Sequence, residues 1–157
     1  MDGIVVHPDP WGYLMSTVAQ ILRSKSSQNV QTMAPDTTVR QALQRMAEHR
    51  IGALLVTQGE QILGIVTERD YARKVELQGR SADTTRLGDI MTADVLFVTP
   101  ANTAQDCMAL MTDKHLRHLP VMDAGRLVGL ISIGDLVKDI ISEQQYLIAQ
   151  LESYIRS

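Results

Sequence analysis

The sequence is short of several residue types, and each shortage excludes something. Aromatic residues make up only 4% of the 157 residues, so a hydrophobic core has to be built from aliphatic side chains. The single cysteine, Cys107, excludes an internal disulfide. It lies in an apolar pattern typical of a helix, which favours a buried packing role over a nucleophilic one. No apolar run approaches the length that spans a bilayer, and we expect no membrane partner.

The charge of the chain is also modest. A formal net charge of −3 lacks the basic excess that nucleic-acid-binding surfaces need, and we expect no nucleic-acid partner. Residues 1–14 contain two prolines and no basic segment followed by an apolar one, unlike a secretory signal. We therefore expect a cytoplasmic protein with a poorly ordered N-terminal extension over residues 1–14 and Met15 as an alternative start.

An internal repeat organises most of the sequence. Gly64 and Gly129 lie 65 positions apart, and the same offset separates Asp70 from Asp135. The alignment needs no gap from about residue 30 to about residue 140. Self-similarity of this length at one fixed offset indicates a tandem duplication.

Each copy predicts the element order β-α-β-β-α. In the first copy, NVQTM is predicted to be extended, and Thr37 or Thr38 is predicted to cap the helix that follows. Two strands, IGALLV and ILGIV, flank the turn QGEQ. The last element is a helix over TERDYARKVEL, capped by Thr67. The second copy repeats this order from DVLFV to SIGDLVKDII, after a short helical turn in RLGDIM. One such sheet buries its apolar face poorly by itself. We therefore expect an α+β fold in which two pseudo-twofold-related repeats pack as one compact module.

These patterns divide the chain into consecutive segments. They are an N-terminal extension (1–14), the first repeat with its leading helix (15–77), a linker (78–88), the second repeat (89–140) and a helical extension (141–157). The last segment carries an apolar stripe from Ile141 to Ile155. The stripe could pack on the N-terminal helix of the same chain or on a second subunit, and both can hold together. We expect a homodimer.

The pattern G-I-V-T-E-R-D at residues 64–70 returns as G-L-I-S-I-G-D at residues 129–135, accompanied by G-D-I-M-T at 88–92 and R-H-L-P-V at 117–121. These motifs resemble the CBS (cystathionine-β-synthase) domain family, in particular a tandem pair that forms one Bateman module. The resemblance covers about residues 22–140. It implies no intrinsic catalysis. It implies binding of an adenine nucleotide (AMP, ADP, ATP or NAD, in some members S-adenosylmethionine) in clefts to which both repeats contribute.

The chemistry of the T/S-x-x-D pattern can be stated without the family. A carboxylate one turn into a helix can accept two hydrogen bonds from a ribose diol, and a hydroxyl at the helix start lies where the helix favours a phosphate. The alternative is that Thr67 and Ser132 are only N-caps and that Asp70 and Asp135 are first-turn acids, worth about 0.5–2 kcal/mol to each helix. The occurrence of both residues in both copies favours ligand binding.

The resemblance implies a first cleft rich in cations. Two arginines that could grip phosphate in a forked geometry belong to this set, together with a histidine donor. Its members are Thr67, Arg69, Asp70, Met91, Thr92, Val95, Arg117 and His118. Arg73 is a further candidate for a second or third phosphate, although it could instead pair with Glu76 or Asp70. Lys74 and Arg80 are weaker candidates.

A second cleft would contain fewer cations. Its members are Lys25, Ser26, Val30, Gly52, Ala53, Ser132 and Asp135. Gly134 stands where the first copy has Arg69, so only Lys25 could supply positive charge. We expect the first cleft to bind a nucleotide more tightly, and the second to be weak, empty or suited to a ligand with less charge.

The most consistent function is a regulatory sensor that transmits its ligand state to an unidentified partner protein. A ligand-independent scaffold is the alternative, and a nucleotide-hydrolysing enzyme is a distant third. The sequence contains no H-E-x-x-H or paired C-x-x-C motif, no G-x-S-x-G motif and no Walker-type loop. We therefore expect no catalytic residues, no metal site and no catalytic cofactor.

Overall fold

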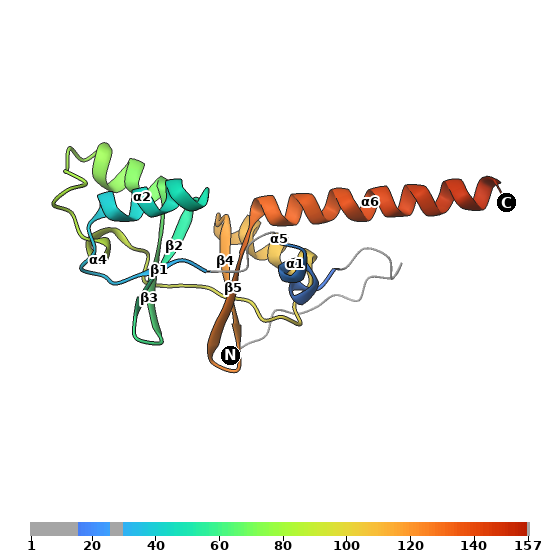
Figure 1. Ribbon diagram of the computed structural model, residues 1–157, viewed down its shortest axis with the longest axis horizontal. Coiled ribbons are helices and arrows are strands. Elements are labelled where there is room, and N and C mark those ends of the chain that lie inside the picture. Colours follow the sequence, from blue (N-terminus) through green and yellow to red (C-terminus); the bar gives the residue numbers. More distant parts are fainter. Residues whose placement is uncertain (1–15, 26–29, 157) are drawn as a thin grey trace. The chain divides into compact units, whose positions relative to one another are not determined.

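The structure is a computed structural model, and it describes residues 16–25 and 30–156. The chain divides into two compact units. One unit consists of residues 29–96, and the other combines residues 1–28 with residues 97–157. Each unit contains one repeat with its own sheet and helices, coloured along the sequence in Figure 1. The expected α+β class is confirmed. Ser26 and the extension over 1–14 lie outside the described residues.

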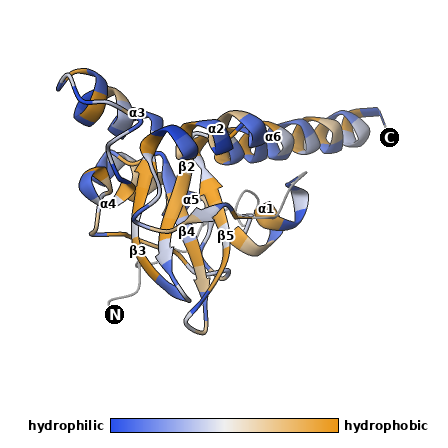
Figure 2. Cartoon of the chain, turned by 60° about the vertical axis from the view of Figure 1, so that its left-hand side comes forward, coloured by the Kyte–Doolittle hydropathy of each residue, from blue (hydrophilic) through white to orange (hydrophobic). Residues whose placement is uncertain are grey.

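The first-repeat unit is built on a sheet with the order β1-β2-β3. β1 (Thr32–Met33) runs parallel to β2 (Ala53–Gln58), which pairs antiparallel with β3 (Gln61–Thr67). The helices are α2 (Val39–His49), α3 (Glu68–Tyr71) and α4 (Leu87–Ile90). The strands carry mainly hydrophobic residues (Figure 2), and the first four residues of β2 are all buried, so both faces of this strand are covered. The core consists of Val39, Ala42, Met46, Leu54, Val56, Val66, Val75, Leu87 and Ile90.

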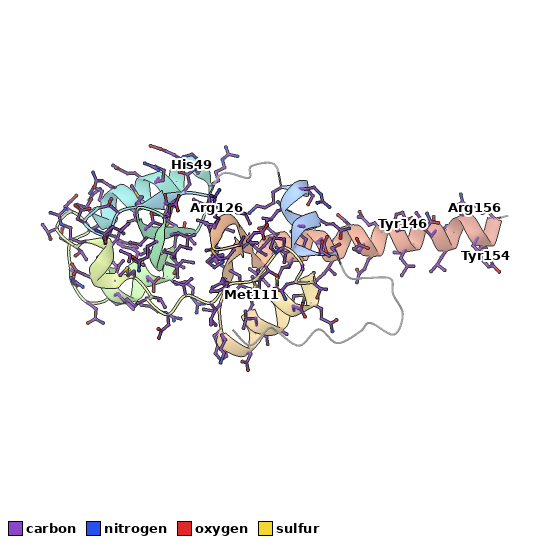
Figure 3. The ribbon with its side chains drawn as sticks, turned by 90° about the horizontal axis from the view of Figure 1, so that it is seen from below. His49, Met111, Arg126, Tyr146, Tyr154 and Arg156 are labelled. Carbon is purple, nitrogen blue, oxygen red and sulfur yellow. The ribbon has the colours of Figure 1, made fainter. Side chains whose placement is uncertain are left out.

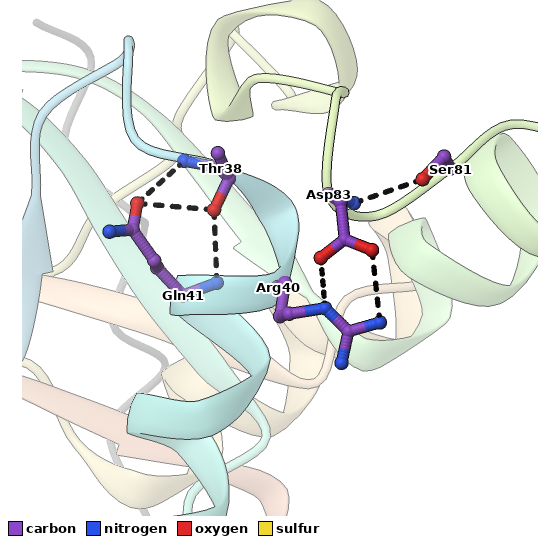
Figure 4. A network of polar contacts seen from close by, with 5 residues as sticks. All are labelled: Thr38, Arg40, Gln41, Ser81 and Asp83. Carbon is purple, nitrogen blue, oxygen red and sulfur yellow. Dashed lines mark hydrogen bonds and ion pairs between the residues drawn. The ribbon is translucent and has the colours of Figure 1, made fainter.

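Helix α2 begins at a reciprocal cap, and Thr38 rather than Thr37 is the N-cap. The main-chain N–H of Gln41 donates to the Thr38 hydroxyl at 3.2 Å, and the main-chain N–H of Thr38 donates to Gln41 Oε1 at 3.1 Å. Beside this cap, Arg40 pairs with Asp83 (Figure 4). The main-chain N–H of Arg40 also donates to the carbonyl of Ala82 at 3.0 Å. The polar linker expected over 78–88 is therefore fastened to α2.

The second-repeat unit has a two-stranded sheet, β4 (His118–Asp123) antiparallel to β5 (Arg126–Ser132). Its helices are α1 (Val18–Ser24), α5 (Ala104–Lys114) and α6 (Ile133–Arg156). Cys107 is buried, as expected. The core consists of Val18, Ile21, Val98, Ala104, Cys107, Met111, Leu119, Val121, Ile131 and Leu136. No helix in the described ranges is long and apolar enough to cross a bilayer.

The helix that precedes each repeat in the sequence packs in the unit of the other repeat. α1 precedes the first repeat, yet Val18 and Ile21 lie in the core of the second-repeat unit. α4 precedes the second repeat, yet Leu87 and Ile90 lie in the core of the first-repeat unit. The packing therefore assigns residues differently from the sequence division, which placed the leading helix within 15–77. The duplication determines which residues are equivalent in the sequence, whereas apolar contacts determine which residues pack in the same unit.

The glycine that opens each G-x-x-T/S motif allows this packing. A Cβ on Gly64 would lie 2.7 Å from Met91 Sδ and 2.9 Å from the carbonyl oxygen of Thr92. A Cβ on Gly129 would lie 2.6 Å from Cδ2 of Leu22. All three distances are too short for two heavy atoms that are not bonded to each other. The absence of a side chain at these two positions is what lets the incoming segment lie against the strand.

The first strand expected in the second repeat is reduced to a single bridge, between Val98 and Val121. In the first repeat, the N–H of Leu55 donates to the carbonyl of Gln31 at 3.2 Å and extends the parallel ladder. The residue equivalent to Leu55 is Pro120, which has no N–H. The ladder therefore cannot continue toward Leu96, and the prediction of a strand over DVLFV was wrong for this reason.

The helix expected from TERDYARKVEL also differs. It runs as α3 and then widens into a π-helical turn at Ala72–Glu76. The N–H of Leu77 accordingly donates to the carbonyl of Ala72, five residues earlier, at 3.0 Å. Val75 is fully buried within this turn. The apolar spacing carried no sign of the wider turn, so the prediction of one regular helix was wrong in this detail.

Candidate ligand-binding sites

Both repeats form the same local motif where the last strand runs into a helix. The N–H of Thr67, at the end of β3, donates to Asp70 Oδ2 at 2.9 Å, and the N–H of Asp70 donates to the Thr67 hydroxyl at 3.1 Å. At the end of β5, the N–H of Ser132 donates to Asp135 Oδ2 at 2.8 Å, and the N–H of Asp135 donates to the Ser132 hydroxyl at 3.1 Å. The capping role is therefore real in both copies, and it holds each carboxylate in place.

A lysine lies against each of these carboxylates. Lys74 Nζ is 3.2 Å from Asp70 Oδ1 and donates to the carbonyl of Ile90 at 2.8 Å. Lys25 Nζ is 2.9 Å from Asp135 Oδ2 and donates to the carbonyl of Leu130 at 2.7 Å. Both aspartate side chains are 15% exposed. Each unit therefore presents an anchored carboxylate, an adjacent ammonium group and a helix start.

The two lysines reach their carboxylates in different ways. Lys74 stands one turn after Asp70 and its side chain is 44% exposed. Lys25 comes from the segment that follows α1, and its side chain is 25% exposed. Screening by water is weaker for the Lys25 pair, so its electrostatic attraction is the stronger one. This agrees with the expectation that Lys25 supplies positive charge beside Asp135.

The pairing around Asp70 was only partly foreseen. The sequence suggested Arg73 as a partner of Asp70 or Glu76, but Lys74 takes Asp70 and Glu76 accepts a hydrogen bond from the Tyr71 hydroxyl at 3.0 Å. The signal that could have identified Lys74 is its i,i+4 spacing from Asp70. The Arg73 side chain is exposed and forms no ion pair with any described residue.

The other cations of the first repeat differ in their environment. Arg69 is exposed and, like Arg73, has no acidic partner in the described parts of the chain. Arg80 Nη2 lies 3.8 Å from Asp89 Oδ2. Two arginines beside the Asp70 motif are therefore available to an anion, whereas Arg80 is already paired.

Met91 and Thr92 lie along β3. The N–H of Thr92 donates to the carbonyl of Ile65 at 2.9 Å, and the N–H of Ile65 donates to the carbonyl of Thr92 at 3.0 Å. Met91 is half-buried against Gly64. These residues and Val95 share a unit with Thr67, Arg69 and Asp70.

Arg117 and His118 belong to the second-repeat unit. Arg117 is exposed just before β4, and His118 pairs with Ser132 across the sheet. Burial lowers the pKa of His118, and the positive charges of Lys25 and Arg117 lower it further, against the opposing effect of Asp135. The imidazole is therefore neutral at pH 7 and can donate one hydrogen bond and accept another.

The residues expected in the second cleft are also divided. Lys25, Ser132 and Asp135 come together in the second-repeat unit. Val30, Gly52 and Ala53 belong to the first-repeat unit, where Ala53 pairs with Thr67. The composition of both clefts stays a prediction.

Metal coordination has no obvious location. Within residues 16–25 and 30–156, no group of three or more His, Cys, Asp and Glu side chains is arranged to hold a metal ion. The chemistry that the two motifs offer is hydrogen bonding and charge, suited to hydroxyls and to an anion.

Known proteins are similar to this chain in sequence and in fold. The family model described as CBS domain matches residues 18–77 and 87–142, and the chain belongs to this family. It is 38% identical to the CBS domain-containing protein CBSX3, mitochondrial, of Arabidopsis thaliana, over 92% of this chain and 74% of that protein. The solved structure of a protein with CBS domains from Burkholderia ambifaria is 56% identical, with a TM-score of 0.79 over 82% of this chain and 96% of that one.

More distant structures match as well. A hexameric CBS-CP12 protein from bloom-forming cyanobacteria is 29% identical, with a TM-score of 0.70 over 80% of this chain and 72% of that one. The CBS domain pair of protein MJ0100, solved with 5′-methylthioadenosine and S-adenosyl-L-methionine, is 21% identical, with a TM-score of 0.67 over 79% of this chain and 94% of that one. This last likeness supports the fold alone.

Proposed function

We propose that this protein is a regulatory module that binds an adenine nucleotide (AMP, ADP, ATP or NAD) and transmits its ligand state to a partner protein. The observation that carries the proposal is the repeated motif, in which a capped aspartate and a lysine lie at a helix start in both repeats. Membership of the CBS domain family supports it.

The ribose would be the part of the ligand that Asp70 and Asp135 recognise. In each motif one carboxylate oxygen accepts the capping N–H, which leaves acceptor capacity for the two hydroxyls of a ribose. The adjacent lysine could turn toward a phosphate of the ligand. Apolar groups beside the motif, such as Met91, would contact the base.

We propose that the Asp70 motif binds the more highly charged ligand. Arg69 and Arg73 are exposed beside it and have no acidic partner among the described residues. Gly134 takes the place of Arg69 in the second repeat. An arginine can bind phosphate oxygens with two parallel hydrogen bonds, so this difference should appear as a difference in affinity.

Calorimetric titration of the full chain with AMP, ADP, ATP and NAD tests the proposal. Asp70→Asn should weaken nucleotide binding at least about tenfold, equivalent to about 1.4 kcal/mol. Asp135→Asn should weaken it less. An asparagine can still accept the capping hydrogen bond, so both variants should stay folded.

A matched control exists in α5, where Thr103 and Asp106 form the same reciprocal cap at 2.9 and 3.1 Å outside either motif. Asp106→Asn should lower stability without lowering nucleotide affinity. Equal losses for Asp70→Asn and Asp135→Asn would contradict the proposed asymmetry. If the unmodified chain bound none of the four nucleotides, the scaffold alternative would replace the sensor.

Signal transmission requires that the ligand bind two states of the module unequally. The partner protein should therefore bind with different affinity in the presence and absence of saturating nucleotide. We further propose that the chain is not an enzyme, so incubation with ATP, ADP and NAD should give no turnover. A cytoplasmic location stays a prediction, since the Arabidopsis relative is named mitochondrial.

We also propose that two copies of the chain associate, as its family includes an oligomeric member, the hexameric CBS-CP12 protein. Analytical ultracentrifugation of the unmodified chain tests this separately from ligand binding.

A further inference from the structure

Helix α6 carries two apolar faces. The first contains Leu136, which lies in the core of its unit, and the half-buried Ile140 and Leu147. On the same side, the Ser16 hydroxyl donates to Glu143 Oε1 at 3.0 Å. Through this inner face, α6 packs in its own unit.

The second face is exposed, and we name it the outer stripe. It consists of Val137, Ile141, Gln144, Ile148, Leu151 and Ile155. At 100° per residue, it is centred about 90° around the helix from the inner face. Its five apolar side chains are between 48% and 79% exposed. Hydrophobic and hydrophilic residues alternate along the whole length of α6 (Figure 2).

The outer stripe extends beyond the part of α6 that packs in its unit. Figure 1 shows α6 continuing past α1 and α5 as one straight helix. Figure 3 shows the same part of the helix, marked by Tyr146 and Arg156. The stripe spans Val137 to Ile155, a length of about 27 Å at 1.5 Å per residue. An apolar strip this long is unusual on a surface that stays in contact with water.

The spacing of the stripe is that of a coiled coil. Its members are separated by four, three, four, three and four residues. Isoleucine occupies every a position (Ile141, Ile148 and Ile155), and Val137, Gln144 and Leu151 occupy the d positions. Apolar residues at a and d form the seam along which two helices pack, and a single polar core residue such as Gln144 specifies the register.

The charges that flank the stripe indicate the direction of the second helix. Among the e positions, Lys138 lies near the start of α6 and Glu152 near its end. In an antiparallel pair, e positions face e positions, so Lys138 of each copy would lie beside Glu152 of the other. In a parallel pair, Glu152 would instead face the g position of Leu147. Only the antiparallel direction is electrostatically complementary.

The antiparallel direction also brings the stripe residues of the two copies opposite one another. With a positions opposite d positions, Ile141 packs on Leu151 of the second copy and Ile155 packs on Val137. Ile148 then packs on Gln144 in the two central layers. All six members of the outer stripe are covered in one register.

We propose that the outer stripe of α6 docks a second copy of this chain as an antiparallel two-helix coiled coil. This inference rests on the proposed self-association and not on nucleotide binding. The contact would use a surface that the aspartate–lysine pairs do not share, so ligand state and assembly can be tested separately.

The first test compares two double variants of the full chain by sedimentation velocity over a range of concentrations. Ile148→Glu with Leu151→Glu places two charges in the stripe. Gln150→Glu with Ser153→Glu adds the same charge to exposed positions on the opposite side of α6. The stripe variant should dissociate at concentrations about a hundredfold higher than the unmodified chain, and the control should not change.

The second test addresses direction through charge reversal. Lys138→Glu and Glu152→Lys should each weaken the dimer, and the two changes together should restore it. The weakening should diminish at high salt, because exposed charge pairs are screened. Equal behaviour of the single and the combined variants would overturn the antiparallel direction.

The other possible results distinguish the outer-stripe interface from self-association in general. A dimer that survives the stripe variant would refute the outer stripe as the interface while leaving self-association intact. An unmodified chain that is monomeric at every concentration would refute both. Circular dichroism of each variant should show unchanged helix content, and nucleotide titration of the stripe variant should give the affinity of the unmodified chain.

Discussion

Replacement of Gly64 by alanine is the most informative change to the first repeat. A Cβ at this position would lie 2.7 Å from Met91 Sδ, 2.9 Å from Met91 Cγ and 2.9 Å from the carbonyl oxygen of Thr92. The thioether can move, but the carbonyl is held by the paired hydrogen bonds between Thr92 and Ile65. The strand and the 91–92 segment must therefore separate.

The expected loss follows from overpacking, which costs about 1–3 kcal/mol in well-packed interiors. Alanine recovers about 0.4–1 kcal/mol relative to glycine through the unfolded chain. Gly64→Ala should therefore lower the free energy of unfolding by about 1–2 kcal/mol. At this chain length the midpoint of thermal unfolding should fall by about 2–4 °C per kcal/mol.

Gly129 provides a matched comparison, because its closest neighbours are Cδ2 and Cδ1 of Leu22, at 2.6 and 2.8 Å, and no main-chain atom. Gly129→Ala should lose its cost in the presence of Leu22→Ala, whereas Met91→Ala should not remove the cost of Gly64→Ala. Double-mutant cycles in urea measure both coupling energies. A Gly64→Ala variant as stable as the unmodified chain, or one rescued by Met91→Ala, would refute the argument that the Thr92 carbonyl sets the limit.

Three further predictions concern charge and burial. Lys25→Met should lower the free energy of unfolding by about 1–2 kcal/mol, because it removes the partner of a mostly buried carboxylate. Lys74→Met should lower it by less than about 1 kcal/mol, because that ion pair is more exposed. Urea unfolding measures both losses, and a larger loss for Lys74→Met would contradict the ranking by exposure. His118 has a lowered pKa in the folded chain, so the unfolded state binds the proton more readily and stability should fall as the pH drops below about 6.5. His118→Gln should reduce this loss in urea titrations between pH 7 and 5, and an unchanged pH profile would show that other groups cause it. Burial raises the pKa of Cys107 to about 12, so a thiol reagent at pH 8 should label the chain only after urea unfolds it, and rapid labelling of the folded chain would place the thiol at the surface.

The local structure of both motifs could be predicted because its causes are local. A reciprocal cap needs only a hydroxyl and an acid three residues apart at a helix start, and the sequence contains such a pair in each motif. The expectation that Lys25 supplies charge beside Asp135 agrees with the structure. Lys74 was underrated because the sequence offered Arg73 as an equally plausible partner, and only the course of the α3 and π-helical turns decides between them.

Two features of the structure that the sequence did not predict are caused by single residues. Pro120 stops the parallel ladder of the second repeat because it replaces the N–H that Leu55 donates in the first. Gly64 and Gly129 looked like motif residues, yet their role is to admit Met91 and Leu22. Proline acts here through its missing N–H, and glycine through its missing side chain. Such a role can be recognised only once the neighbouring residue in the folded chain is known.

The duplication, the caps, the family and the element order of the first repeat could be predicted from the sequence alone, because each depends on residue spacing along the chain. Tertiary structure decided which residues share a unit. It placed α1 with the second repeat and α4 with the first, since apolar surfaces pack wherever they are complementary, irrespective of their order in the chain. It also separated the two apolar faces of α6, because only contact with the rest of the unit shows which of two adjacent stripes is covered and which remains exposed.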